Sequence, residues 1–117
     1  MAGSRPTPVQ PWGWRSMWVI AMFDLPTDTE KARKAYARFR KALIEDDFTM
    51  MQYSIYMRHC ASIENAEVHV RRMGDLVPAV GEVRFLTITD KQFSRIRIYV
   101  GKKRQPTPPP PLQLELF

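Results

Sequence analysis

The chain has 117 residues, 44% of them hydrophobic, and a formal net charge of +6 with an isoelectric point near 9.8. This length fits one domain with a modest core, and no apolar run approaches the roughly 18 residues that a membrane helix needs. The single cysteine, Cys60, excludes an intrachain disulfide and fits a reducing cytoplasm; with His59 and His69 it provides too few ligands for a zinc set. The basic charge favours an acidic partner, most commonly nucleic acid, although a basic surface without a partner is a common alternative.

Both ends of the chain differ in composition from the middle. Residues 1–15 are proline-rich and lack the apolar stretch of a signal peptide, so they are expected to be a flexible leader. Residues 16–101 carry the periodic patterns of a folded domain. Residues 102–111 form a basic and proline-rich linker, in which "PTPPPP" predicts a stiff polyproline II spacer before the apolar residues 112–117.

The first predicted element is a buried strand at residues 17–24, "MWVIAMFD", which Pro26 ends. Thr27 and Glu30 have the spacing of a capping box, so a helix is predicted from there to about Leu43. Its apolar side chains recur at helical spacing on one face: Ala32, Ala35, Tyr36, Phe39 and Leu43.

Residues 48–58, "FTMMQYSIYMR", predict a second strand that is apolar on both faces, so both faces should be covered. Ser62 is predicted to cap a second helix that runs to about Val77. Its expected core face consists of Ile63, Ala66, Val70, Met73 and Val77. A third strand is predicted at residues 81–89, then a short turn or helical piece, and a fourth strand or an irregular edge at 95–101.

This order of elements is close to the ferredoxin-like βαββαβ plan, an α+β fold with two helices on one face of an antiparallel sheet. The predicted order places the second helix between the second and third strands and uses residues 95–101 as the last strand. The other face of the sheet is left open. Its apolar residues predict a second copy packing there, which would make a homodimer.

Two stretches that contain several cations and no acid predict contact with phosphate. The first is residues 31–41, where an all-cationic helix face costs like-charge repulsion, and the second is residues 95–104. The expected nucleic-acid-binding residues are Lys31, Arg33, Lys34, Arg38, Lys41, Arg95, Arg97, Lys102 and Lys103. Arg71 and Arg72 form a third, smaller cluster. A solvated outer face is the alternative for the first stretch. In a dimer such a surface would follow a duplex backbone without reading sequence.

The last residues, "LQLELF", alternate as a strand does. Six residues are too few for a strand that stands alone, so we expect this segment to add to the edge of the partner subunit's sheet as a swapped strand. The expected partner-binding residues are Leu112, Leu114, Leu116 and Phe117. A disordered tail is the alternative.

Three stretches in this order, "MFDLP", "MMQYSIYMR" and "ITDKQF", resemble the small CRISPR-associated Cas2 family, and most closely its branch from type II systems. The resemblance covers most of residues 16–117. It implies a ferredoxin-like homodimer that acts in spacer acquisition, where it bridges two dimers of the CRISPR integrase Cas1 and double-stranded DNA lies across the assembly. Many relatives carry a glycine where this chain has Asp47.

The family is often described as endoribonucleases, and the resemblance implies that Asp24 binds Mg²⁺ at the dimer interface. Some members are metal-dependent nucleases on RNA or DNA, although that activity is dispensable in the integrase complex. Judged from the residues alone, Asp24 has three roles open: capping the turn before the helix, binding Mg²⁺ together with the partner's Asp24, or sharing a proton with it.

No second strong acid or base stands beside Asp24 in the sequence, and Asp28 and Asp90 are candidates only. Two symmetry-related copies of one carboxylate would supply few of the groups that a nuclease active site needs. A DNA-bridging scaffold is therefore expected ahead of a catalyst, with Asp24 as the candidate catalytic residue. A stand-alone metal-dependent endoribonuclease and a ferredoxin-like RNA-binding module are the alternatives.

Overall fold

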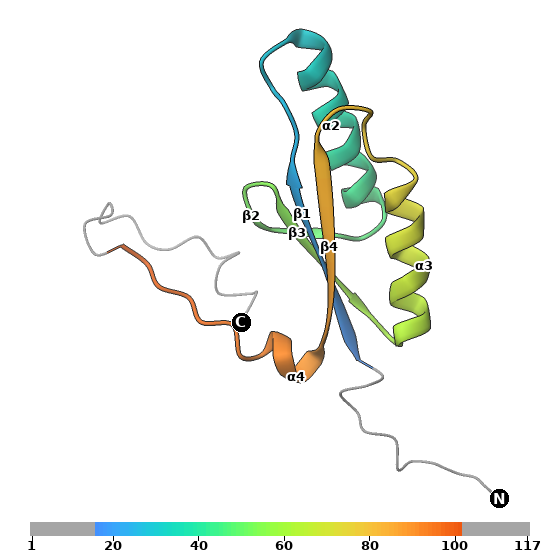
Figure 1. Ribbon diagram of the computed structural model, residues 1–117. Coiled ribbons are helices and arrows are strands. Elements are labelled where there is room, and N and C mark those ends of the chain that lie inside the picture. The colour runs from blue at the N-terminus through green and yellow to red at the C-terminus, as the bar shows by residue number, and fades with distance from the viewer. Residues whose placement is uncertain (1–15, 102–117) are drawn as a thin grey trace, which may run out of the picture.

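Seven elements follow one another in the part of the chain that this computed structural model describes, residues 16–101 (Figure 1). The order of strands and helices is βαββαβ with one short helix at the end, which confirms the predicted ferredoxin-like plan. The elements are β1 (Met17–Asp24), α2 (Glu30–Glu45), β2 (Thr49–Gln52), β3 (Ile55–Cys60), α3 (Ile63–Gly74), β4 (Glu82–Thr89) and α4 (Asp90–Phe93).

The four strands form one antiparallel sheet in the order β2-β3-β1-β4. Strand β1 is central, and its partners run from Met17 opposite Cys60 in β3 to Asp24 opposite Glu82 in β4. A central strand has neighbours on both edges, and this one is also covered on at least one face. This position accounts for the apolar run that the sequence shows at residues 17–23.

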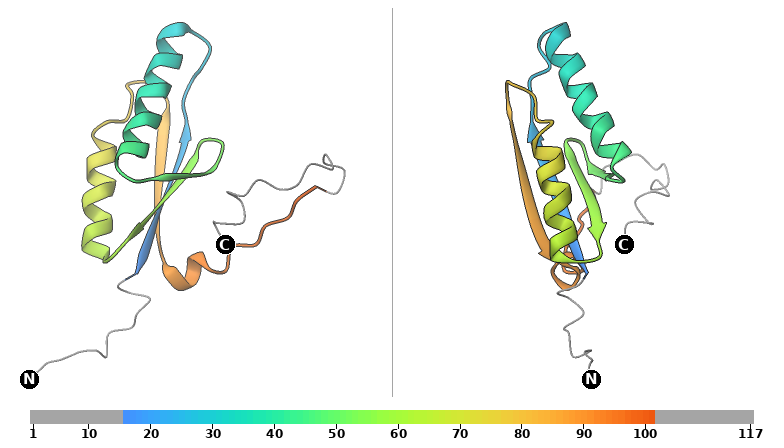
Figure 2. Two further views of the ribbon diagram at one scale, coloured as in Figure 1. Left: turned by 180° about the vertical axis from the view of Figure 1, so that it is seen from behind. Right: turned by 90° about the vertical axis from the view of Figure 1, so that its right-hand side faces the viewer.

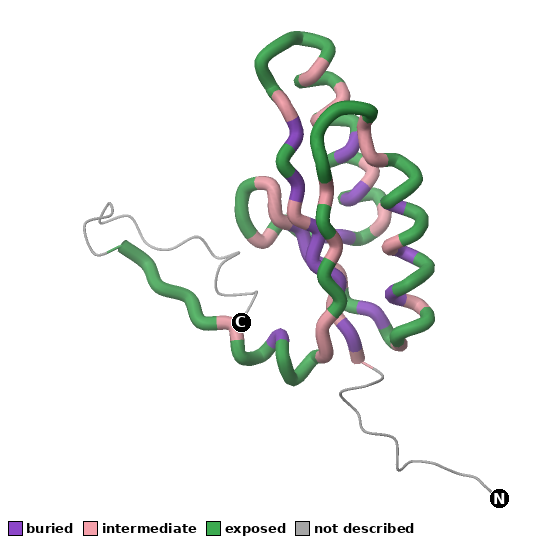
Figure 3. The backbone as a smooth tube through the Cα atoms, viewed as in Figure 1, coloured by how far each residue is buried: buried purple, intermediate pink, exposed green. Residues whose placement is uncertain are grey.

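Helices α2 and α3 cover the same face of the sheet (Figure 2). Alternate side chains of β1, among them Val19 and Phe23, point toward these helices and pack with Phe39 and Leu43 of α2 and with Met73 of α3. The buried parts of the sheet and of both helices face one another (Figure 3). The predicted placement of both helices on one face is therefore confirmed.

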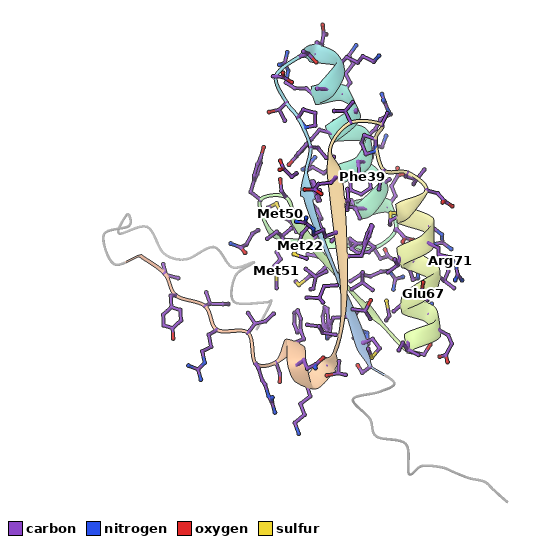
Figure 4. The ribbon with its side chains drawn as sticks, in the orientation of Figure 1. Met22, Phe39, Met50, Met51, Glu67 and Arg71 are labelled. Atoms are coloured by element: carbon purple, nitrogen blue, oxygen red, sulfur yellow. The ribbon has the colours of Figure 1, made fainter. Side chains whose placement is uncertain are left out.

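The opposite face of the sheet carries a second apolar cluster around Ile20, Met57 and Phe93. Helix α4 covers one end of this face, where the Trp18 and Phe93 rings stack with centroids 3.9 Å apart. The rest of this face, which we call the open face, has no helix over it in the described part of the chain. Figure 4 shows Met22 and Met51 near the β2–β3 hairpin, away from α3.

The single strand predicted at residues 48–58 is wrong, because the structure has a hairpin there. Strand β2 ends at Gln52, β3 begins at Ile55, and the register shifts between Met50 and Gln52. The turn contains Ser54 with a φ of 65°. No glycine, proline or asparagine marks this turn, so the alternation of apolar residues runs through it unbroken. The hairpin supplies the strand that the prediction had assigned to residues 95–101.

The helix boundaries also differ from the predicted ones. Thr29, and not Thr27, caps α2, because its side chain accepts a hydrogen bond from the backbone N–H of Ala32 at 3.0 Å. Helix α3 begins after its predicted cap, Ser62, but ends at Gly74 instead of Val77. Ile63, the first residue of the helix, is 55% exposed and does not belong to the core face.

Residues 95–100 form no strand in the described part of the chain. They follow α4 as an extended segment that leads away from the sheet, and they are exposed apart from Ile96 (Figures 1 and 3). The predicted leader, linker and apolar end lie outside the described residues. None of the helices between residues 16 and 101 is long and apolar enough to cross a membrane.

Candidate nucleic-acid interface and carboxylate site

Asp24 is exposed at the end of β1, directly opposite Glu82 of β4. Residues paired in this way across antiparallel strands point to the same face of the sheet, so the two carboxylates are neighbours. The Glu82 carboxylate is 3.5 Å from the Arg84 guanidinium, whereas the Asp24 side chain makes no hydrogen bond or ion pair within residues 16–101. The capping role for Asp24 is therefore wrong, since Thr29 begins the helix instead.

Glu82 is the acid that the sequence did not place beside Asp24, because only the strand register brings the two together. The sequence made Asp28 and Asp90 candidates for this second acid. Of these, Asp28 lies in the loop before α2. Asp90 accepts a hydrogen bond at 2.7 Å from the indole N–H of Trp18, near the other end of β1. Within the described ranges no three His, Cys, Asp or Glu residues are grouped so as to hold a metal. Asp24 and Glu82 fit a weak Mg²⁺ site in which water and phosphate supply most ligands.

The exposed outer flank of α2 carries four cations at helical spacing, Lys31, Lys34, Arg38 and Lys41, which we call the basic stripe. Its ends are ten residues apart, or about 15 Å along the helix. One of its cations is paired, Lys34 with Glu30 at 3.8 Å in an exposed pair. Two further acids, Asp28 and Glu45, line the same surface hollows as Lys31, Arg38 and Lys41 but form no ion pair with them. The other three cations make no ion pair or hydrogen bond within the described chain. Glu30, Lys31, Lys34 and Arg38 line a shallow depression of about 380 Å³.

Arg33 and Arg40 lie on the other flank of α2, so the cations of residues 31–41 do not form one continuous face. Arg33 donates to the backbone carbonyl of Thr27 at 3.1 Å, and Arg40 donates through Nε to the Tyr56 hydroxyl at 2.9 Å. These bonds fix two exposed guanidinium groups on the side of the helix that carries Tyr36.

The remaining predicted cations fall into three groups. Arg95 and Arg97 are exposed on the extended segment after α4, and Lys102 and Lys103 lie outside the described residues. The smaller cluster at Arg71 and Arg72 is not a free basic patch. Arg72 is 2.6 Å from the Asp46 carboxylate, and Arg71 is 4.0 Å from Glu67 on the outer surface of α3 (Figure 4).

A polar network at the end of α2 was not predicted from the sequence. The largely buried carboxylate of Asp46 accepts at 2.6 Å from Arg72, and its other oxygen lies 2.7 Å from Nδ1 of buried His69. Arg58 donates to the Asp46 backbone carbonyl at 2.8 Å. Burial raises the pKa of the nearby Cys60 thiol, so this cysteine is a protonated core residue and no nucleophile.

The tip of the β2–β3 hairpin presents an aromatic pair. The Tyr53 ring is 78% exposed and stacks on Tyr36 of α2, with centroids 6.2 Å apart and planes inclined by 25°. The next residue, Ser54, has a left-handed backbone that costs a non-glycine residue about 1–2 kcal/mol. Its carbonyl accepts from the Phe23 N–H at 3.0 Å, and its hydroxyl is 3.0 Å from that of Tyr36.

Together, the fold and these side chains define a small ferredoxin-like domain with a basic helix flank and exposed carboxylates at one end of its sheet. The sequence model of the family described as CRISPR associated protein Cas2 matches residues 17–96. The chain belongs to this family, whose named relatives place it in CRISPR defence.

The curated relatives are called CRISPR-associated endoribonuclease Cas2. The protein from Parvibaculum lavamentivorans is 81% identical over 86% of this chain and all of the relative, and that from Flavobacterium psychrophilum is 50% identical over 89% of this chain and 90% of the relative. A crystal structure of Cas2 matches 81% of this chain and 95% of that chain with a TM-score of 0.54 and 18% identity. That likeness supports the fold.

Proposed function

We propose that this Cas2 chain is a subunit of the CRISPR adaptation machinery that binds double-stranded DNA and bridges dimers of the Cas1 integrase. The observation that carries the proposal is the basic stripe on α2. Three of its four cations, Lys31, Arg38 and Lys41, have no internal partner in residues 16–101. Free, evenly spaced cations on a rigid helix suit the phosphates of a duplex, and they provide affinity without sequence readout.

A homodimer is part of this proposal, and the open face of the sheet supports it. Leu86, on the edge strand β4, is 47% exposed on this face, and Met22 and Ile88 are half-buried there. A second copy placed there would bury these apolar side chains. It would also present the basic stripe twice on one assembly, as a protein that spans a length of duplex requires.

A second candidate function is the endonuclease activity in the names of the relatives. The observation that favours it is the free carboxylate of Asp24 beside Glu82. These two side chains would hold Mg²⁺, which when bound would polarise a phosphate and activate water. Asp24 would then be the catalytic residue and a ligand. With both carboxylates used as ligands, no further His, Cys, Asp or Glu is grouped with them among the described residues, so we rank this activity below DNA binding.

The basic stripe is tested by removing two of its unpaired charges. The double variant Lys31→Ala, Arg38→Ala should bind a blunt DNA duplex at least tenfold more weakly than the wild type. The slope of log K against log salt should fall by about two, because two phosphate contacts are lost. Fluorescence anisotropy over a series of salt concentrations measures both quantities.

The matched control is Arg71→Ala, Lys91→Ala, which removes the same charge from exposed side chains outside the stripe. Its duplex affinity and salt slope should stay close to those of the wild type. Equal losses in both double variants would mean that only net charge matters, and the stripe would not be the DNA-binding surface.

A further inference from the structure

The exposed ring of Tyr53 has no role in the fold that its contacts explain. It is held on one side by stacking on Tyr36, and the neighbouring Ser54 is fixed to both Phe23 and Tyr36 by hydrogen bonds. Its outer face is nevertheless open to solvent. A rigid turn with a positive φ that presents a bare aromatic face is costly, and such strain is concentrated at binding sites. The geometry suits a flat ligand stacking on the outer face.

Two guanidinium groups on the flank of α2 that carries Tyr36 favour a ligand with negative charge. Arg33 lies one turn before Tyr36 on α2, and Arg40 lies one turn after it. They are seven residues apart, or about 10 Å along the helix, and each is exposed but fixed by a hydrogen bond. This surrounding repels a cationic side chain and attracts an anion. A nucleotide combines the required flat ring with a negative phosphate.

The protonation state of Tyr53 is compatible with an anionic ligand. Hydrogen bonding to Tyr36 raises the pKa of the Tyr53 hydroxyl above its ordinary value. A tyrosine is already a neutral phenol at physiological pH, and this shift keeps Tyr53 neutral, so the ring does not repel phosphate. The hydroxyl would ionise only at a more alkaline pH than an isolated tyrosine.

We propose that Tyr53, supported by Tyr36, is a stacking site for an unpaired nucleobase whose phosphates are held by Arg33 and Arg40. Aromatic side chains bind unpaired bases in this way with little preference for the base. The site rests on the proposed nucleic-acid-binding function and adds a second part to it. The basic stripe would hold a duplex on one flank of α2, and the hairpin tip would take an unpaired nucleotide on the other.

The position of the tip links this site to the carboxylates. The Ser54 carbonyl is bonded to the backbone of Phe23, the residue just before Asp24. A nucleotide stacked on Tyr53 would therefore lie at the end of the sheet that carries Asp24 and Glu82. Both RNA and DNA can supply an unpaired base, and the test compares the two.

The test uses the full-length protein and a duplex with a single-stranded overhang of about four nucleotides, long enough to cross a helix roughly 10 Å wide. The overhang contains the fluorescent base 2-aminopurine and is made as RNA and as DNA. Wild type should quench 2-aminopurine and bind the overhang duplex more tightly than the blunt duplex. Tyr53→Ala should remove the quenching and weaken overhang binding about 5- to 100-fold, with blunt-duplex affinity unchanged. Tyr53→Phe should behave as wild type.

The control is Tyr99→Ala, which removes a tyrosine that is 84% exposed but stacks on no other described ring. It should leave quenching and affinity unchanged. Quenching that persists in Tyr53→Ala would overturn the stacking site, and so would equal losses in both tyrosine variants. If the wild type binds neither duplex, the proposed function itself fails. If blunt and overhang duplexes bind equally well, only the stacking site fails.

Discussion

The Asp24 carboxylate and the Glu82 carboxylate face the same side of the sheet on neighbouring strands. Like charges directly opposite one another destabilise a sheet by a few tenths of a kcal/mol up to about 1 kcal/mol. Arg84 offsets the charge of Glu82 at 3.5 Å, but Asp24 has no such partner within residues 16–101. A side chain that costs stability and forms no internal contact is better explained by binding than by folding.

Replacing Asp24 separates these roles. Asp24→Asn should leave the free energy of unfolding unchanged or raise it by a few tenths of a kcal/mol, because the repulsion with Glu82 is relieved. If cleavage is intrinsic, the same variant should lose Mg²⁺-dependent cutting of RNA or DNA, as measured on gels with purified protein. Asp28→Asn removes an exposed acid from the next loop and should retain the activity. Undiminished cutting by Asp24→Asn would assign the activity to another residue or to a contaminant.

At the scale of the elements, one carboxylate connects the end of α2 to the rest of the domain. Asp46 lies just after α2 and binds His69 and Arg72 of α3 through its side chain and Arg58 of β3 through its carbonyl. The next residue, Asp47, has a φ of 68°, the left-handed region that glycine adopts freely. Asp47 thus adopts a left-handed backbone in the turn between α2 and β2, which costs a non-glycine residue about 1–2 kcal/mol.

Removing the Asp46 side chain should be strongly destabilising. In Asp46→Ala, buried His69 would lose its only described side-chain partner and Arg72 its counter-ion. Because Arg72 is half-exposed, we expect a loss of about 2–4 kcal/mol, near the lower end for buried pairs. Urea unfolding followed by circular dichroism measures the change. Asp75→Ala, at the exposed end of α3, should change stability by less than about 1 kcal/mol.

The elements that were predicted correctly are encoded by residues that lie close together in the sequence. The apolar run of β1, the helical spacing of Phe39 and Leu43, and the Ser62 cap all depend on near neighbours in the chain. The split between β2 and β3 is not encoded in this way, because Tyr53 and Ser54 resemble strand residues and only tertiary bonds hold their turn. Glu82 and the Asp46 network depend on strand register and helix placement, which neighbouring residues do not encode.

At the scale of the whole molecule, the two faces of the sheet in the described domain are covered unequally. Both long helices cover one face of the sheet, and only α4 covers part of the other (Figure 2). The open face carries the exposed side chain of Leu86 on the edge strand β4 and the half-buried side chains of Met22 and Ile88. A second copy with the same face would complete the core, which is the homodimer that we propose.

A charge placed on the open face should prevent this association. Leu86→Glu puts a carboxylate at a position that is 47% exposed in the single chain and would be buried in the dimer. We expect it to run as a monomer in size-exclusion chromatography with light scattering, at concentrations where the wild type is expected to run as a dimer. Leu76→Glu changes a leucine that is 51% exposed in the loop after α3, away from this face, and should remain dimeric. A dimeric Leu86→Glu variant would place the interface elsewhere.

The burial of Cys60 has a practical consequence for labelling. The chain's single native thiol is enclosed by the core, and its raised pKa keeps the reactive thiolate scarce at neutral pH. A maleimide dye or spin label would therefore react first with a cysteine introduced at an exposed position such as Lys91. Distances across the assembly that we propose on DNA could thus be measured by spectroscopy in a chain that keeps its natural core.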